Sequence, residues 1–227
     1  MLVDLNLKGM DVVVAGAGRE ATRKVQVLLS QPCRIEVVSD QFSESIEDWA
    51  KQGRITLRRL VLRDGTFLRD YEALILVMAA TDDSRLNRIL VEQARPLARF
   101  VYCVDDPEWS DFSHPAVCQV RDEVQVALST GGRSPLMARI LREKLEGILR
   151  EIITAEDALH IQLQERLRPR VKKWAADSRT RLTFLESIYQ DPDITRLLSA
   201  EGVDAAERKA LERLQPHLEK GKSGSKK

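Results

Sequence analysis

Short apolar runs alternate with amphipathic stretches through the first half of the chain. The apolar runs cover residues 11–16, 34–39, 54–62, 73–80 and 99–106, and the amphipathic stretches cover residues 19–29, 41–51 and 83–94. Strands that alternate with helices in this way are typical of βαβ units. The pattern therefore predicts an α/β domain built on a parallel sheet.

The apolar character of each run predicts where its strand lies in the sheet. Residues 12–15 and 74–79 are apolar throughout, as expected for central strands that helices cover on both faces. The run at residues 54–62 contains Arg58 and Arg59 and is more polar. We therefore expect it to lie nearer an edge.

Beyond residue 112 the chain predicts one last strand, a Gly-Gly turn and then helices only, as far as residue 215. The first long helix begins with Ser134 as its N-cap and Pro135 at its first position. Pro169 is expected to kink or divide the helix that follows. Apolar residues recur there at helical spacing, at Leu159, Leu163, Leu167, Val171 and Trp174, and again at Leu182, Leu185, Ile188 and Tyr189.

Composition and charge narrow the class of protein. The chain has 227 residues, 43% of them hydrophobic, and Lys+Arg 36 against Asp+Glu 35 give a net charge of +1. Some of the basic residues belong to a Gly/Ser-rich tail at residues 218–227 that is predicted to be disordered, so no nucleic-acid footprint is indicated. The longest apolar run, residues 73–80, is too short to cross a membrane. We expect a cytoplasmic, soluble protein that binds neither nucleic acid nor membrane.

Cysteine and histidine usage predicts no disulfide and no dedicated metal site. Cys33, Cys103 and Cys118 are an odd number without CxxC spacing, and they are expected to be small buried hydrophobic residues. His160 and His217 have no metal-ligand partner one helical turn away.

The strongest local motif is a GxGxxA sequence at residues 16–21, directly after an apolar strand and at the start of an amphipathic helix. Gly16 permits a tight turn, Gly18 lets a pyrophosphate approach the backbone, and Ala21 allows the helix to pack closely on the strand. The helix N-terminus offers free N–H groups to a phosphate. The context predicts a Rossmann-type dinucleotide site in preference to a glycine turn without a ligand.

Residues after the second and fourth strands complete this predicted site. Ser39, Asp40 and Gln41 end the second strand, where an acidic residue bonds a ribose hydroxyl and disfavours a 2′-phosphate, so NAD is preferred over NADP. The alternative, equally weighted, is that Asp40 caps the next helix. Small residues at 80–82, Ala80, Thr81 and Asp82, leave room for the cofactor, and Asp83 is expected to cap the helix that follows.

Four segments together resemble one family. They read VVVAGAGREATRK, AATDDSRLN, VYCVDDPEWSDFSHPAV and VALSTGGRSPLMARILREKLE. The chain is similar to the precorrin-2 dehydrogenases of the siroheme synthase family over about residues 1–150. The resemblance implies NAD-dependent oxidation of precorrin-2 to sirohydrochlorin, and in some members insertion of ferrous iron.

The resemblance also implies the organisation of the chain. It predicts a Rossmann-type NAD-binding domain at residues 1–112, a dimerisation segment at 113–150, and an all-helical C-terminal domain at 151–217. Two subunits are expected to form a homodimer around the substrate sites.

Residue roles follow from the same resemblance. Gly16, Gly18, Arg19 and Glu20 fall on the phosphate side of the cofactor, Asp40 and Gln41 on the adenosine side, and Ala80, Thr81 and Asp82 beside the nicotinamide half. Asp105 matches the catalytic aspartate, which suits the carboxyl end of a strand in an open α/β sheet. The alternative is that Asp105 and Asp106 only initiate the turn DDPE. The chain departs from the family pattern at Glu20, Tyr102 and His114.

A tetrapyrrole with many carboxylates needs anion sites. The loop at residues 129–134 offers backbone amides, a helix N-terminus and a guanidinium, and its predicted substrate-binding residues are Ser129, Thr130, Gly131, Gly132, Arg133 and Ser134. Arg139 and Arg142 are interpreted as surface partners of Glu143 and Glu146 rather than substrate ligands. His114 is either a structural residue or a group that ligates iron or moves protons.

A second class of function also fits the cofactor motif. A nucleotide-sensing regulatory module uses an N-terminal Rossmann-type domain as a homodimer without catalysis. Such a module has no need for STGGRSP before a long helix, nor for an acid after the fifth strand. The enzyme is therefore the leading hypothesis.

Overall fold

The computed structural model describes residues 2–223, with side chains described as far as Leu214. The chain divides into two compact units, Met1–His114 and Pro115–Lys227. The division falls two residues beyond the boundary predicted at residue 112. Helix α8 (Val203–Ser223) includes the first part of the tail predicted at 218–227, and the rest of that tail lies outside the described residues.

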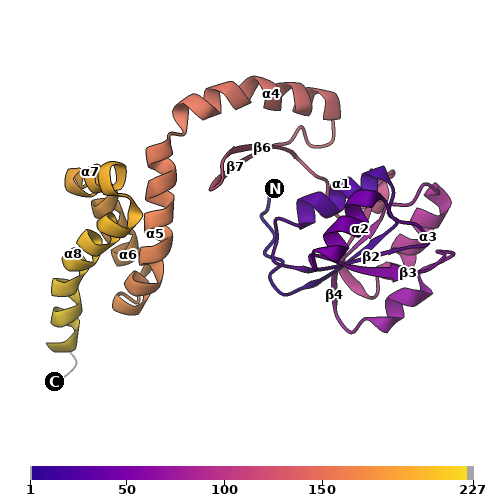
Figure 1. Ribbon diagram of the computed structural model, residues 1–227, viewed down its shortest axis with the longest axis horizontal. Helices are drawn as coiled ribbons and strands as arrows, with labels where there is room; N and C mark the ends of the chain where they lie inside the picture. The colour runs from indigo at the N-terminus through magenta and orange to yellow at the C-terminus, as the bar shows by residue number, and fades with distance from the viewer. Residues whose placement is uncertain (1, 224–227) are drawn as a thin grey trace. The chain divides into compact units, whose positions relative to one another are not determined.

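The first unit is a five-stranded sheet with strand order β3-β2-β1-β4-β5, in which every neighbouring pair is parallel. Helices lie against the sheet (Figure 1). The elements are β1 (Asp11–Ala15), α1 (Arg19–Leu28), β2 (Arg34–Ser39), α2 (Glu44–Lys51), β3 (Thr56–Arg59), β4 (Leu74–Ala79), α3 (Ser84–Ala94) and β5 (Ala98–Cys103). The predicted parallel sheet is confirmed, and so is the edge position of β3.

Alternating side chains of the central strands feed two cores, one on each face of the sheet. Val12 and Val14 of β1 pack with the buried face of α1, whereas Val13 packs with Leu90 and Val91 of α3. Burying each such aliphatic side chain contributes about 1.5–3 kcal/mol. This two-sided burial holds the carboxyl ends of β1 and β4 in fixed positions beneath the loops that follow them.

The second unit begins with an antiparallel hairpin and continues as helices. The elements are β6 (Ala116–Arg121), β7 (Val124–Leu128), α4 (Pro135–Ile152), α5 (Ala155–Trp174), α6 (Ser178–Tyr189), α7 (Pro192–Glu201) and α8. Strand β6 was not predicted. Its alternation of exposed Val117 and Gln119 with buried Cys118 and Val120 is the signal that would have found it.

The helical core confirms the first predicted apolar series and corrects the second. Leu163, Leu167 and Val171 of α5 are fully buried or nearly so, and α5 runs through Pro169 without being divided. On α6, however, Leu182 and Tyr189 are 57% and 51% exposed. The other two predicted residues, Leu185 and Ile188, do contact the helical core, and Phe184, which the prediction left out, is buried beside them.

Two findings concern the other predictions from composition. Cys33, Cys103 and Cys118 are free; Cys103 and Cys118 are buried as predicted, whereas Cys33 is only partly buried, so the prediction of a buried residue is wrong there. Within residues 2–223, no helix has both the length and the apolar character needed to cross a membrane.

Candidate functional site

A cleft of about 580 Å³ opens at the carboxyl ends of β1, β2 and β4. Its lining includes eight of the ten residues predicted to bind cofactor, which are Gly16, Gly18, Ser39, Asp40, Gln41, Ala80, Thr81 and Asp82. Phe42, Val61, Leu62 and Leu86 supply apolar surface. Arg19 and Glu20 are not part of this lining, and Glu20 pairs with Arg23 at 3.0 Å.

The two motif glycines meet different requirements. Gly16 has φ +108°, and a Cβ there would lie 2.3 Å from the carbonyl oxygen of Ala80. Gly18 has the ordinary angles φ −74° and ψ −167°, and a Cβ would lie 3.7 Å from Asp82 Oδ1. The fold therefore needs a glycine at 16, whereas Gly18 leaves open space at the N-terminus of α1, where a phosphate would sit.

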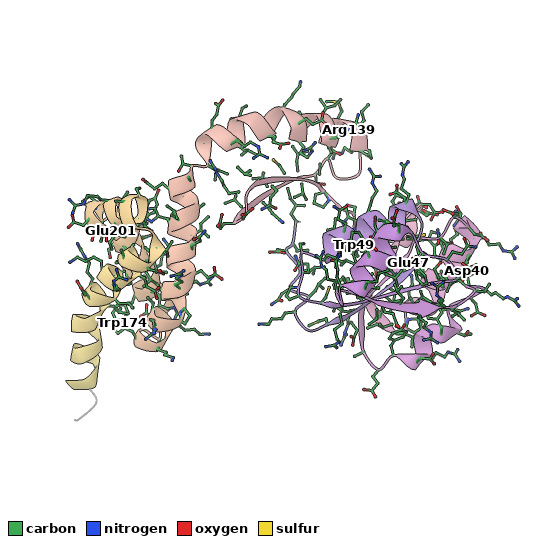
Figure 2. The ribbon with its side chains drawn as sticks, viewed as in Figure 1. Asp40, Glu47, Trp49, Arg139, Trp174 and Glu201 are labelled. Carbon is green, nitrogen blue, oxygen red and sulfur yellow. The ribbon has the colours of Figure 1, made fainter. Side chains whose placement is uncertain are left out.

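Asp40 is exposed at the end of β2 and lines the cleft. The N-cap of α2 is Ser43, so the alternative role of Asp40 as the helix cap is wrong. The carbonyl oxygen of Asp40 accepts a 3.4 Å hydrogen bond from Arg59 of β3, whose guanidinium also pairs with Glu47 at 3.2 Å. Figure 2 labels Asp40 and Glu47 on this unit. Sequence reasoning missed Arg59 because only strand pairing brings it beside Asp40.

The loop after β4 is held by side chains of α3. Asp83 caps the helix by accepting hydrogen bonds from the backbone N–H groups of Arg85 and Leu86, as predicted. Asn87, one turn into the helix, binds the backbone and hydroxyl of Thr81. Thr81 therefore lines the cleft in a fixed conformation.

Asp105 lies two residues beyond β5 and is exposed. Its Oδ1 accepts hydrogen bonds from Asn87 Nδ2 at 3.1 Å and from the Cys103 thiol at 3.2 Å. Partial burial pushes the pKa of Asp105 upward, but hydrogen bonds from Ser84, Cys103 and Asn87 outweigh it and bring the pKa below its usual value. Asp105 is therefore a carboxylate at neutral pH.

The turn role proposed for both acids belongs to Asp106. Its side chain accepts a 3.2 Å hydrogen bond from the N–H of Glu108 at the start of η2 (Pro107–Trp109), and it pairs with Arg88 at 2.9 Å. Asp105 takes no part in this cap.

Sequence reasoning missed Asn87 and Cys103. The signal for Asn87 was an amide on the apolar face of an amphipathic helix, where burial is costly unless the amide is hydrogen-bonded. The signal for Cys103 was its place two residues before the acid. Burial, followed by the hydrogen bond to Asp105, raises the pKa of the Cys103 thiol to about 11, so this group is a hydrogen-bond donor rather than a nucleophile.

The glycine loop of the second unit has the local structure that its sequence predicts. Gly131 and Gly132 have φ +63° and +78°, and Ser134 caps α4 by accepting from the N–H of Met137 at 3.2 Å. Thr130 Oγ1 bonds both the N–H and the carbonyl of Ser134 at 3.1 Å. Arg133 is exposed. The loop therefore presents a guanidinium and the amides of a helix start.

The arginines further along α4 make ion pairs with glutamates. Arg139, labelled in Figure 2, lies 3.9 Å from Glu143, and Arg142 lies 2.9 Å from Glu146. The ion pairs predicted for these two arginines are therefore present.

His114 lies in an aromatic group of the first unit. Its ring centroid is 4.9 Å from that of Tyr102 and 5.4 Å from that of Phe112. Burial, followed by the charge of Lys24, lowers the pKa of His114 to about 4, so the imidazole is neutral at pH 7. Among the side chains that the structure describes, those of residues 2–214, no three potential metal ligands gather into a group. His217 lies outside these described side chains.

Comparison with known proteins places this geometry in context. Residues 3–116 match a family described as putative NAD(P)-binding, and residues 121–148 match one described as sirohaem biosynthesis protein, central. The siroheme synthase of Nitrosococcus oceani is 32% identical over 201 residues, covering 88% of this chain and 41% of the relative. Siroheme synthase 2 of Serratia proteamaculans is 34% identical over 206 residues, covering 90% of this chain and 42% of the relative.

A solved structure titled SirC, precorrin-2 dehydrogenase, has a TM-score of 0.66 and 22% identity, covering 95% of this chain and 99% of that chain. At this identity the likeness shows the fold. The chain spans about two fifths of the length of the curated relatives. The matches confirm the predicted resemblance to siroheme synthases, and the first family confirms the nicotinamide dinucleotide class of cofactor.

Proposed function

Because the chain belongs to the putative NAD(P)-binding family, we propose that it is an NAD-dependent dehydrogenase that oxidises precorrin-2 to sirohydrochlorin. The observation that carries this proposal is the ionised Asp105, hydrogen-bonded through Asn87 to the cofactor loop at Thr81. A nucleotide sensor needs the cleft but has no use for a carboxylate held next to it. The siroheme synthases to which the chain is similar supply the substrate class.

The cleft residues fit the cofactor. Gly18 leaves the start of α1 open to the pyrophosphate, with Arg19 and Glu20 beside it, and Asp40 stands where it can bond the ribose hydroxyls. When bound, NAD accepts the hydride that leaves a carbon of the macrocycle. Asp40 carries a negative charge beside the position of a 2′-phosphate, so we propose a preference for NAD over NADP.

Asp105 is the proposed catalytic residue. Oxidation removes a hydride and a proton from the macrocycle, and a carboxylate beside the reacting carbon directs the proton that leaves. The same group would serve the second proposed activity, ferrous iron insertion, in which the pyrrole nitrogens must lose protons as the metal enters.

The glycine loop is the proposed substrate-binding segment. Arg133 and the backbone amides of Gly131 and Gly132 offer positive ends to carboxylates, and Ser129, Thr130 and Ser134 offer hydroxyls. These are the groups that a polycarboxylate tetrapyrrole requires.

We also propose that the second unit forms a homodimer through α4. An apolar stripe runs along the helix at positions separated by three or four residues and stays exposed; it comprises Met137, Leu141, Leu145, Ile148 and Ile152. Within this unit α4 packs mainly on the β6–β7 hairpin, which leaves that stripe free. A continuous apolar stripe of this length is typical of an interface, and a second copy of α4 presents the matching surface.

One assay separates the enzyme from the sensor. Purified protein is mixed with precorrin-2 and NAD under anaerobic conditions, and NADH and the sirohydrochlorin spectrum are followed together. The dehydrogenase produces both in equal amounts. Binding of NAD without either product would overturn the proposal in favour of the regulatory module, and adding ferrous iron tests the second activity.

A further inference from the structure

Asn87 is a polar side chain in the interior of the first unit. It lies on α3 and is 0% exposed, on the helix face that also carries the buried Leu90 and Val91. A buried amide destabilises the fold unless its donors and acceptor are all hydrogen-bonded. We therefore expect Asn87 to have hydrogen-bond partners that an apolar residue at this position could not satisfy.

The amide of Asn87 uses its full hydrogen-bonding capacity on two residues. Its Oδ1 accepts from the backbone N–H of Thr81 at 2.9 Å and from the Thr81 hydroxyl at 2.7 Å. Its Nδ2 donates to the carbonyl oxygen of Thr81 at 3.0 Å and to Asp105 Oδ1 at 3.1 Å. Because a backbone N–H can only donate, the amide has a single orientation that satisfies all four bonds.

Those two residues belong to separate loops. Thr81 follows β4 and lines the cofactor cleft, whereas Asp105 follows β5. The Cys103 thiol of β5 and the Ser84 side chain of α3 also hydrogen-bond Asp105, and the ion pair of Arg88 with Asp106 belongs to the neighbouring turn. Within the described residues, Asn87 is the side chain that hydrogen-bonds both loops.

We propose that Asn87 is a positioning residue, which fixes the Asp105 carboxylate to the Thr81 loop so that the cofactor cleft and the acid keep one relative geometry. The inference rests on the proposed dehydrogenase function for its catalytic meaning. The physical link between the two loops stands on the hydrogen bonds alone. A substitution that breaks these hydrogen bonds at one loop should therefore alter the other loop, whereas one that keeps the acceptor at residue 105 should not.

The test uses a reciprocal exchange of amide and acid in the full chain. Asn87→Asp is nearly isosteric, but it places a carboxylate against Asp105 and removes the donor. At pH 8 we expect NAD to bind about tenfold more weakly and the melting temperature to fall, because a buried hydrogen bond is replaced by a like-charge contact. Adding Asp105→Asn restores an amide next to a carboxylate with the roles exchanged. The exchange restores the hydrogen bond between residues 87 and 105 but leaves the carbonyl oxygen of Thr81 without its donor. The double variant should therefore recover part of the NAD affinity and melting temperature that Asn87→Asp loses, while precorrin-2 oxidation stays slow.

The control is Val91→Ala, a truncation on the same helix at another fully buried position. It should lower the melting temperature without changing the dissociation constant for NAD, and adding Asp105→Asn should not restore its stability. If Asn87 had a purely structural role, Asn87→Asp would likewise lower the melting temperature without changing NAD affinity, and Asp105→Asn would not restore its stability. Absence of rescue in the double variant, with Asn87→Asp folded, would overturn the inference.

Failure of the inference and failure of the proposed function give different results. NAD affinity and melting temperature are measured without turnover, so the rescue tests the link even if the wild-type protein leaves precorrin-2 unchanged. If the wild-type protein oxidises precorrin-2 and Asn87→Asp turns over at the wild-type rate, the positioning role is wrong and the function stands. The expected result is a large fall in kcat with a KM for precorrin-2 close to that of the wild type.

Discussion

Gly16 and Gly18 lie two residues apart in one motif, yet their substitutions should fail in opposite ways. For Gly16→Ala, a side chain at φ +108° costs about 1–3 kcal/mol in backbone strain. The new Cβ would lie 2.3 Å from the carbonyl oxygen of Ala80, and relieving that overlap costs about 1–3 kcal/mol more. The sum, about 2–6 kcal/mol, corresponds to a fall in melting temperature of about 8–24 °C for a unit of this size.

Gly18→Val should leave the fold nearly intact and remove the cofactor. Its backbone angles suit any residue, and the nearest atom to a Cβ is Asp82 Oδ1 at 3.7 Å. The loss of a glycine N-cap costs about 1 kcal/mol. The isopropyl group occupies the space that the pyrophosphate needs, so the dissociation constant for NAD should rise by at least about a hundredfold, near 2.7 kcal/mol.

Calorimetry of NAD binding and thermal unfolding, both on the full chain, check the two predictions together. The control is Gly53→Ala, at φ +70° with no atom within 4 Å of the new Cβ, which should cost only the strain of about 1–2 kcal/mol. If Gly16→Ala melts at the same temperature as Gly53→Ala, the contact with Ala80 does not carry the cost. If Gly18→Val binds NAD within threefold of wild type, the loop is a turn and not the phosphate site.

Three further predictions concern the acid, the cofactor and the interface. Asp105→Asn should lower the dehydrogenase rate by a factor of about 10²–10⁴ with NAD affinity nearly unchanged. Asp106→Asn, which weakens only the turn, should lower the dehydrogenase rate far less. NAD should bind at least about tenfold more tightly than NADP. Glu47→Gln, which releases Arg59 beside the ribose site, should lower the ratio of the NADP dissociation constant to that of NAD. An unchanged ratio would exclude Arg59 from cofactor selection. Ile148→Glu should convert the dimer to monomer in light scattering at micromolar concentration, and a wild-type monomer there would refute the α4 interface.

The sheet and its cofactor motif could be predicted from sequence because both depend on short-range signals. The alternation of apolar runs with amphipathic stretches predicted which strands lie at the centre of the sheet and which lies at an edge. The GxGxxA spacing located the turn at Gly16. Caps were also predictable, since Asp83 and Ser134 act on N–H groups two or three residues away. The glycine turn and the two caps are each encoded within about one helical turn of the residue concerned, and each strand or helix is encoded in its own run of residues.

Features that depend on tertiary pairing could not be predicted in this way. Arg59 reaches Asp40 only because β3 pairs with β2, and Asn87 reaches Asp105 only because α3 packs beside β5. On α6 Leu182 is exposed and Phe184 is buried, because the two side chains are both apolar and tertiary packing decides between them. Apolar periodicity predicts that a helix has a buried face, but the packing of neighbouring helices determines which residues form that face.

The environment of Asp105 bears on how a dehydrogenase of this kind would use it. A general base works best when its pKa lies near the working pH, yet the hydrogen bonds from Ser84, Cys103 and Asn87 outweigh burial and hold the pKa of Asp105 below its usual value. Such a carboxylate keeps its charge instead of storing a proton. Hydride removal leaves positive charge on the macrocycle, and a fixed negative charge beside it stabilises that state without needing to reorganise. A carboxylate in this position could either accept the leaving proton or direct it, and we infer the second role, in which the proton passes to water and the carboxylate guides its departure.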